Sequence, residues 1–80
     1  MEELRSAANR AVGTKAVLRA LTAGTAARVY IATDSDTFLY QKVVRAAEAA
    51  GVRLVKVESG RELGKVCGLQ IGCAAAALLR

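Results

Sequence analysis

Gly13, Thr14 and Lys15 form the first place where this sequence could do chemistry. They lie where a short extended segment turns into a helix, so free backbone N–H groups and the positive end of the helix dipole can hold a phosphate. Arg19 follows Lys15 by four residues and shares its exposed side, so both cations could reach a nucleic-acid backbone or a guanine edge. The alternative is an ordinary helix start with solvated cations, since the upstream glycines of a Walker loop are missing.

A second place is the segment 68–73, in which the apolar residues Leu69 and Ile71 stand between two glycines after a predicted helix. If this segment is a surface loop, its apolar side chains could stack on splayed bases while backbone amides contact phosphate or sugar. The residues alone favour the alternative, in which Leu69 and Ile71 begin the last strand and face the core.

Asp34 and Asp36 resemble a paired-carboxylate site for acid–base chemistry or a metal. Because both flank Ser35 between a strand and a helix, a role in capping backbone N–H groups is favoured. The chain has no histidine, and Cys67 and Cys73 lie among small apolar residues. We therefore expect two core thiols, whose spacing would permit a disulfide outside a reducing compartment, and no metal, cofactor or catalytic site.

The composition limits the chain to one small domain with an affinity for anions. Eighty residues bury a single core, and a net charge of +5 attracts phosphate backbones or anionic membranes, although the same charge could simply keep a small domain in solution. No run of about 18 apolar residues is present, and the N-terminus is polar, so we expect a soluble cytoplasmic protein.

Apolar periodicity predicts the elements in order. Positions 4, 7, 8 and 11 predict a short helix that ends before Gly13 and exposes its two arginines, at positions 5 and 10. A second helix has Thr14 as its N-cap and ends at Gly24. A buried strand over 28–33 and a helix from Thr37 to Gly51 follow.

The second half of the chain predicts a strand, a short helix and a final strand. Residues 52–57 form the strand, with Leu54 and Val57 on one side. Ser59 and Glu62 form a capping box for a helix ended by Gly68. Periodicity permits either a strand or a buried helix for the alanine-rich tail 71–79, and the strand is favoured because a central strand between two helical layers needs small side chains. Together these elements predict an α/β fold, a single three-layer α/β/α sandwich with a small mixed sheet.

Several segments, taken in order, resemble the ribosomal L-seven-Ae-like family. Its short bacterial members, of the YbxF type, share the length, the Leu-Gly-Lys-x-Cys-Gly run and the alanine-rich last strand. The resemblance covers nearly the whole chain and implies one RNA-binding domain over residues 1–80 that recognises kink-turn RNA, in which tandem sheared G·A pairs bend two helices. The segments that carry it are Gly13-Thr14-Lys15, Arg19 to Gly24, Val29 to Thr33 with Asp34 and Asp36, and Leu63 to Gly68.

The resemblance also implies which residues contact RNA. Lys15 would contact O6 and N7 of a sheared-pair guanine, Arg19 a phosphate, and the loop the flipped-out nucleotide, because only a distorted RNA exposes guanine edges to a helix end. Ala16 departs from the family pattern, which has a polar side chain there, so one base contact is missing. Thr37 stands where relatives often carry proline, which affects the helix start. The implied RNA-binding set is Gly13, Thr14, Lys15, Arg19, Leu69, Gln70, Ile71, Gly72 and Cys73.

The leading hypothesis is a monomeric, non-catalytic RNA-binding protein that stabilises a kink-turn in ribosomal RNA, a riboswitch or another transcript, with ribosomal proteins as further partners. The alternative is a protein-interaction module on the same fold with reduced RNA affinity, which Ala16 motivates. An enzyme is the least favoured class, because only the two aspartates and the two cysteines could serve as its catalytic groups.

Overall fold

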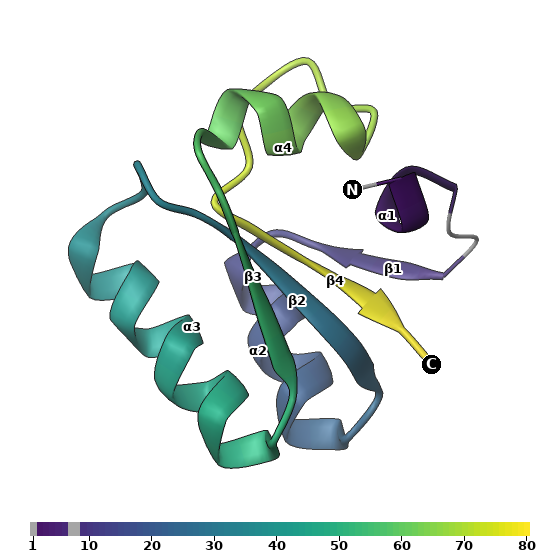
Figure 1. Cartoon of the computed structure of the whole chain (residues 1–80), viewed down its shortest axis with the longest axis vertical. Coiled ribbons are helices and arrows are strands. Elements are labelled where there is room, and N and C mark those ends of the chain that lie inside the picture. The colour runs from purple at the N-terminus through teal and green to yellow at the C-terminus, as the bar shows by residue number, and fades with distance from the viewer. Residues whose placement is uncertain (1, 7–8) are drawn as a thin grey trace.

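The computed structural model describes residues 2–6 and 9–80 (Figure 1). None of the helices in this part of the chain is long and apolar enough to cross a membrane. The elements, in chain order, are α1 (Glu2–Ser6), β1 (Arg10–Val12), α2 (Thr14–Ala23), β2 (Ala26–Ala32), α3 (Thr37–Ala50), β3 (Arg53–Val57), α4 (Gly60–Val66) and β4 (Ala75–Leu79).

The four strands form one mixed sheet in the order β1-β4-β2-β3. β2 and β3 are parallel and joined through α3, as is usual for strands connected by a helix, whereas β4 runs antiparallel to both β1 and β2. Ala75, Ala76 and Ala77 of β4 have no exposed surface, so the first three residues of this inner strand present only methyl groups to the layers on either side. Small side chains on such a strand let helices approach both faces of the sheet.

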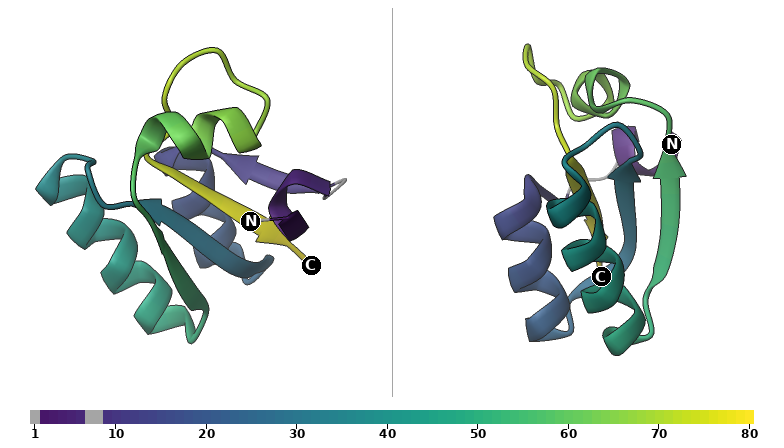
Figure 2. Two further views of the ribbon diagram at one scale, coloured as in Figure 1. Left: turned by 45° about the horizontal axis from the view of Figure 1, so that its top comes forward. Right: turned by 90° about the vertical axis from the view of Figure 1, so that its left-hand side faces the viewer.

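Helices cover both faces of the sheet, which confirms the predicted three layers (Figure 2). On one face, α2 and α3 bury Val17, Leu21 and Val43 against β2 and β4. On the other face, α1 and α4 bury Leu4 and Leu63 against Tyr30 and Ala76. Burial of these apolar side chains in two separate clusters is the main force that holds the layers together.

The helix boundaries follow the predicted capping residues at most ends. α3 begins after Asp36, whose carboxylate accepts hydrogen bonds from the backbone N–H groups of its first turn, and it ends at Gly51. The Ser59 hydroxyl accepts from the Glu62 backbone N–H at the start of α4. α2 ends at Gly24 in the left-handed conformation, as expected for a glycine C-cap.

The short helix predicted at the start of the chain is present, but its predicted end before Gly13 is wrong. The first helix ends at Ser6, and Arg10–Val12 forms a strand that pairs with β4 rather than the last turn of a helix. Arg10 is consequently half-buried, not exposed as predicted. Hydrogen bonds to a strand more than sixty residues away override the local helical pattern here. Ala7 and Ala8, on which that pattern also rested, lie outside the described residues.

Three smaller predictions are also corrected. Thr14 is the first residue of α2, and Gly13 occupies the cap position instead. Leu54 packs with the α2–α3 side and Val57 with the α4 side, because residues three apart in a strand point to opposite faces. The last strand begins at Ala75, four residues later than predicted.

Candidate nucleic-acid interface

Backbone hydrogen bonds gather four segments at one end of the sheet. The Gly13 N–H donates to the Ala75 carbonyl at 2.9 Å, which places the start of α2 beside the start of β4. The Gly60 N–H donates to Asp34 Oδ1 at 2.9 Å, so the β2–α3 turn contacts the start of α4. The Cys73 N–H donates to the Gly60 carbonyl at 2.9 Å and ties in the end of the segment between α4 and β4. This end of the molecule is uppermost in Figure 1.

The start of α2 differs from the other two helix starts at this end. Gly13 has φ 97° and ψ 151°, a conformation that essentially only glycine adopts, and it supplies no side-chain cap. Asp36 caps α3 and Ser59 caps α4, so side chains already occupy amides of those helices. With no acidic residue in its first turn, α2 offers its backbone N–H groups and positive dipole end to an anion.

Lys15 and Arg19 are both exposed on the outer side of α2, as predicted. Neither cation forms an ion pair with any residue in the ranges 2–6 and 9–80. Thr14 and Gly13 are half-buried next to them. Two cations without acidic partners beside an uncapped helix start produce a positive potential suited to phosphate.

The segment 68–74 is a surface loop whose backbone lies directly on α4. The Leu69 N–H donates to the Gly64 carbonyl at 2.8 Å. A Cβ added to Gly64 would lie 2.3 Å from the Ile71 carbonyl oxygen, so only a glycine in α4 permits this approach. The resemblance placed Gly64 in a shared motif, but periodicity gave no sign of this contact.

With its backbone against α4, the loop turns its apolar side chains outward. Ile71 is 76% exposed and Leu69 is 37% exposed, so the interpretation that they begin a strand and face the core is wrong. Gln70 and Gly72 are exposed as well. Cys73 is buried, and its thiol donates to the Ala75 carbonyl at 2.9 Å, so its side chain belongs to the core while its backbone closes the loop.

Arg10 is a structural residue of this site that sequence reasoning missed. Its guanidinium donates to the Cys67 carbonyl at 3.0 Å and to the Leu4 carbonyl at 3.3 Å, near the last turns of α4 and α1. A cation at the negative end of a helix dipole is favourable. Arg10 therefore fixes the point at which the exposed loop leaves α4. No pattern in the sequence indicated this role, because the carbonyl groups that Arg10 contacts belong to other elements.

The groups that could have supported catalysis have structural roles. Asp36 accepts from the backbone N–H groups of Phe38 at 2.9 Å and Leu39 at 3.2 Å, and Asp34 accepts from Gly60, so both act as the predicted caps. Burial, aided by the neighbouring Cys73, raises the pKa of the Cys67 thiol, which keeps it protonated and weakly nucleophilic. In the described part of the chain, no three potential metal-ligating side chains gather.

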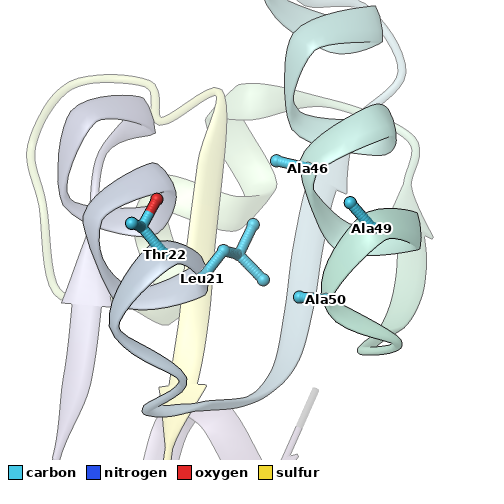
Figure 3. A pocket seen from close by; sticks show the side chains of 5 residues that line it. All are labelled: Leu21, Thr22, Ala46, Ala49 and Ala50. Atoms are coloured by element: carbon cyan, nitrogen blue, oxygen red, sulfur yellow. The ribbon is translucent and has the colours of Figure 1, made fainter.

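A shallow hollow of about 250 Å³ lies apart from this end, between α2 and α3 (Figure 3). Leu21 and Thr22 of α2 face Ala46, Ala49 and Ala50 of α3 across it. The Thr22 hydroxyl already donates to the Leu18 carbonyl at 3.0 Å. The hollow therefore lacks the converging polar groups of a small-molecule site.

The fold and the arrangement of these segments are those of a known family. The ribosomal protein L7Ae/L30e/S12e/Gadd45 family matches this chain over residues 1–80. The chain belongs to that family. The resemblance predicted from the sequence is thus confirmed, and with it the α/β/α architecture of this L7Ae family member.

Relatives of this family member are similar over nearly its whole length. A protein named RNA-binding protein from Geobacillus thermodenitrificans (strain NG80-2) is 44% identical over 79 residues, which cover 99% of this chain and 96% of that protein. The RNA-binding protein YbxF from Geobacillus stearothermophilus is 43% identical with the same coverage. The solved structure of the Giardia lamblia 15.5kD RNA binding protein is similar with a TM-score of 0.88 at 25% identity, over 99% of this chain and 67% of that one.

Proposed function

We propose that this protein is a non-catalytic RNA-binding protein that recognises kink-turn RNA, with residues 1–80 acting as one binding domain. The observation that carries the proposal is the uncapped start of α2, where backbone amides stay open beside Lys15 and Arg19, two cations without an acidic partner in the described part of the chain. RNA-binding relatives that match the chain over nearly their whole length, and an RNA-binding structural neighbour, support it.

In the proposed complex, the start of α2 enters the opened groove at the kink. Lys15 contacts O6 and N7 of a sheared-pair guanine, and Arg19 contacts a phosphate. A regular A-form helix keeps its major groove too deep and narrow for these side chains, so the kink supplies the selectivity. Thr14 contributes its backbone amide. The Gly13 N–H already donates to the Ala75 carbonyl, so Gly13 contributes by letting the RNA approach closely, because it has no side chain.

The exposed loop provides the second contact. Leu69 and Ile71 pack over the flipped-out nucleotide, while Gln70 and Gly72 offer polar and backbone groups to the sugar–phosphate chain. An apolar side chain as exposed as Ile71, at 76%, is costly to leave in water, so burial against a base is favourable. Cys73 contributes only through its backbone, since its thiol faces the core.

The proposed targets are ribosomal RNA, a riboswitch or another structured transcript in the cytoplasm, with the protein acting as a monomer beside ribosomal proteins. The direct test is titration of the protein with a kink-turn RNA and with a matched RNA whose sheared G·A pairs are disrupted. We expect much tighter binding of the kinked RNA. Equal affinity for both RNAs would overturn kink-turn recognition while leaving general RNA binding intact.

Ala16 favours a second candidate function, a protein-interaction module on the same fold. Its methyl group packs partly against the α2–α3 core, where it cannot replace the polar contact expected at this position. In that case the protein would fold normally but bind kink-turn RNA weakly or without dependence on salt. The same titration, repeated over a range of salt concentrations, separates the two functions.

A further inference from the structure

The outer face of α2 and α3 concentrates positive charge. Lys15 and Arg19 on α2 and Lys42 and Arg45 on α3 are all exposed, and Glu48 is the only acid in either helix. Four cations against one acid leave +3 of the chain's net +5 on these two helices. None of the four cations has an acidic partner among residues 2–6 and 9–80.

The opposite layer lacks this concentration. There Glu3 of α1 pairs with Arg28 of β2, and α4 alternates Arg61, Glu62 and Lys65 along its sequence. Mixed charges of this kind are typical of an ordinary solvated surface. The α2–α3 face therefore differs in its charge from an ordinary solvated surface.

Two of the cations precede, by one helical turn, residues that line the hollow between α2 and α3. Arg19 lies one turn before Thr22, which lines the hollow on the α2 side, and Arg45 lies one turn before Ala49, which lines it on the α3 side. The alanines that line the α3 side are short, so a nucleic-acid backbone could approach the helices closely with a guanidinium on each side. Arg and Lys at such positions bind phosphates as charge-assisted hydrogen-bond donors.

The same face continues to the proposed kink-binding end. Phe38, in the first turn of α3, is 73% exposed and is followed by Lys42 four residues later and Arg45 seven residues later, so the three share one side of the helix. Asp34 ties this end of the β2–α3 turn to the start of α4. On α2, Lys15 is the first of the exposed cations on this face.

We propose that the α2–α3 face binds the phosphate backbone of the RNA helix that flanks the kink, with Lys42 and Arg45 as its phosphate ligands. This inference rests on the proposed function, because it extends the RNA-binding surface that the proposed function assigns to Lys15 and Arg19. It assigns to the outer face of α3 a role separate from recognition of the kink. Longer RNA helices thereby gain affinity that a minimal kink-turn cannot supply.

The test uses two RNAs with the same kink, one with minimal flanking helices and one with a flanking helix extended by about one turn. The variant is Lys42→Gln/Arg45→Gln in the full chain. The matched control is Arg53→Gln/Lys56→Gln, which removes the same two residue types from exposed positions on the edge strand β3. Circular dichroism and thermal unfolding check that both variants are folded.

On the extended RNA, we expect the α3 variant to bind about threefold to tenfold more weakly and to lose about two units of the slope of log affinity against log salt, one for each phosphate contact. On the minimal RNA, its affinity should stay within about twofold of wild type, as should that of the control variant on both RNAs. An unchanged salt slope on the extended RNA, or an equal loss in the control, would overturn the inference.

Failure of this inference is distinguishable from failure of the proposed function. If wild-type protein prefers kinked over G·A-disrupted RNA but the α3 variant keeps its salt slope, only the α3 assignment is wrong. If wild-type protein shows no preference for the kink, the proposed function is wrong, whatever the variant does.

Discussion

The start of α2 and the loop after α4 lie at the same end of the sheet, but different physical means hold them in place. The start of α2 is shaped by one glycine in a rare backbone conformation, and its chemistry is electrostatic. The loop is held by contacts of its backbone with α4 and by Arg10, and its chemistry is apolar. A binding surface can thus combine a charged part set by local conformation with an apolar part set by packing.

Gly64→Ala is expected to have the largest effect, and it acts on the loop alone. The added Cβ would lie 2.3 Å from the Ile71 carbonyl oxygen, so the loop must move away from α4. Overpacking of this kind typically costs about 1–3 kcal/mol, only partly offset by the helix propensity that alanine adds. Urea denaturation should show the lower free energy of unfolding, and titration should show weaker binding of kink-turn RNA.

Gly60→Ala is the control for that substitution, because it introduces a milder steric contact with the same loop. Its Cβ would lie 3.1 Å from the Cys73 carbonyl oxygen, a tight contact that a shift of a few tenths of an ångström relieves. We expect a smaller loss of both stability and RNA affinity. If Gly64→Ala binds RNA as tightly as wild type, the position of the loop does not contribute to recognition.

Lys15→Ala tests the charged part of the binding surface, which lies at the start of α2. Its side chain is exposed, so the free energy of unfolding should change by less than about 0.5 kcal/mol. Kink-turn binding should weaken by about 1–3 kcal/mol if Lys15 reads a guanine, or lose about one unit of salt slope if it contacts only phosphate. Lys56→Ala, exposed on β3, is the matched control. Equal RNA affinity of the two variants would remove Lys15 from the interface.

Asp36→Ala should lower stability without lowering RNA affinity, which is the reverse of Lys15→Ala. It therefore tests the contrast between the capped start of α3 and the uncapped start of α2. It removes the acceptor for two backbone N–H groups of α3, which should cost about 1 kcal/mol of stability. RNA affinity of the folded protein should not fall, because the positive end of α2 is untouched. Asp36→Asn, which preserves the cap, should be as stable as wild type. A loss of RNA affinity comparable to that of Lys15→Ala would contradict this separation.

The smallest expected effect concerns Cys67, at the junction of α4 and the loop. Because burial raises its pKa in the folded state, the unfolded thiol ionises first as pH rises. Its contribution to stability is therefore complete below the ordinary thiol pKa of about 8.5 and is lost as pH rises through the higher folded value. Between neutral and alkaline pH, the free energy of unfolding should fall more steeply for wild type than for Cys67→Ala. Parallel curves would contradict this linkage.

The sequence predicted well those features that depend on local chemistry. α3 lies between the predicted residues Thr37 and Gly51, and the Ser59–Glu62 pattern marked the start of α4, because capping residues act within a single turn. The exposure of Lys15 and Arg19 followed from helical periodicity. The family followed from motifs spread over the chain rather than from any one residue.

Features that depend on distant partners were not predictable in this way. The strand Arg10–Val12 exists because β4 offers it hydrogen bonds, and a three-residue strand has no period of its own. The outward direction of Leu69 and Ile71 depends on the close contact between Gly64 and the loop backbone. Arg10 binds carbonyl groups from two other elements, which no pattern along the chain could indicate.

The alanines of β4 also constrain how this protein can evolve. Ala75 and Ala77 face the α2–α3 cluster, while Ala76 faces the α1–α4 cluster, and all three are fully buried. A larger residue at any of them would push a helical layer away from the sheet and shift the segment that enters β4 from the loop. Amino-acid substitutions in this strand would therefore alter the geometry of the candidate interface, even though none of these alanines would touch a ligand.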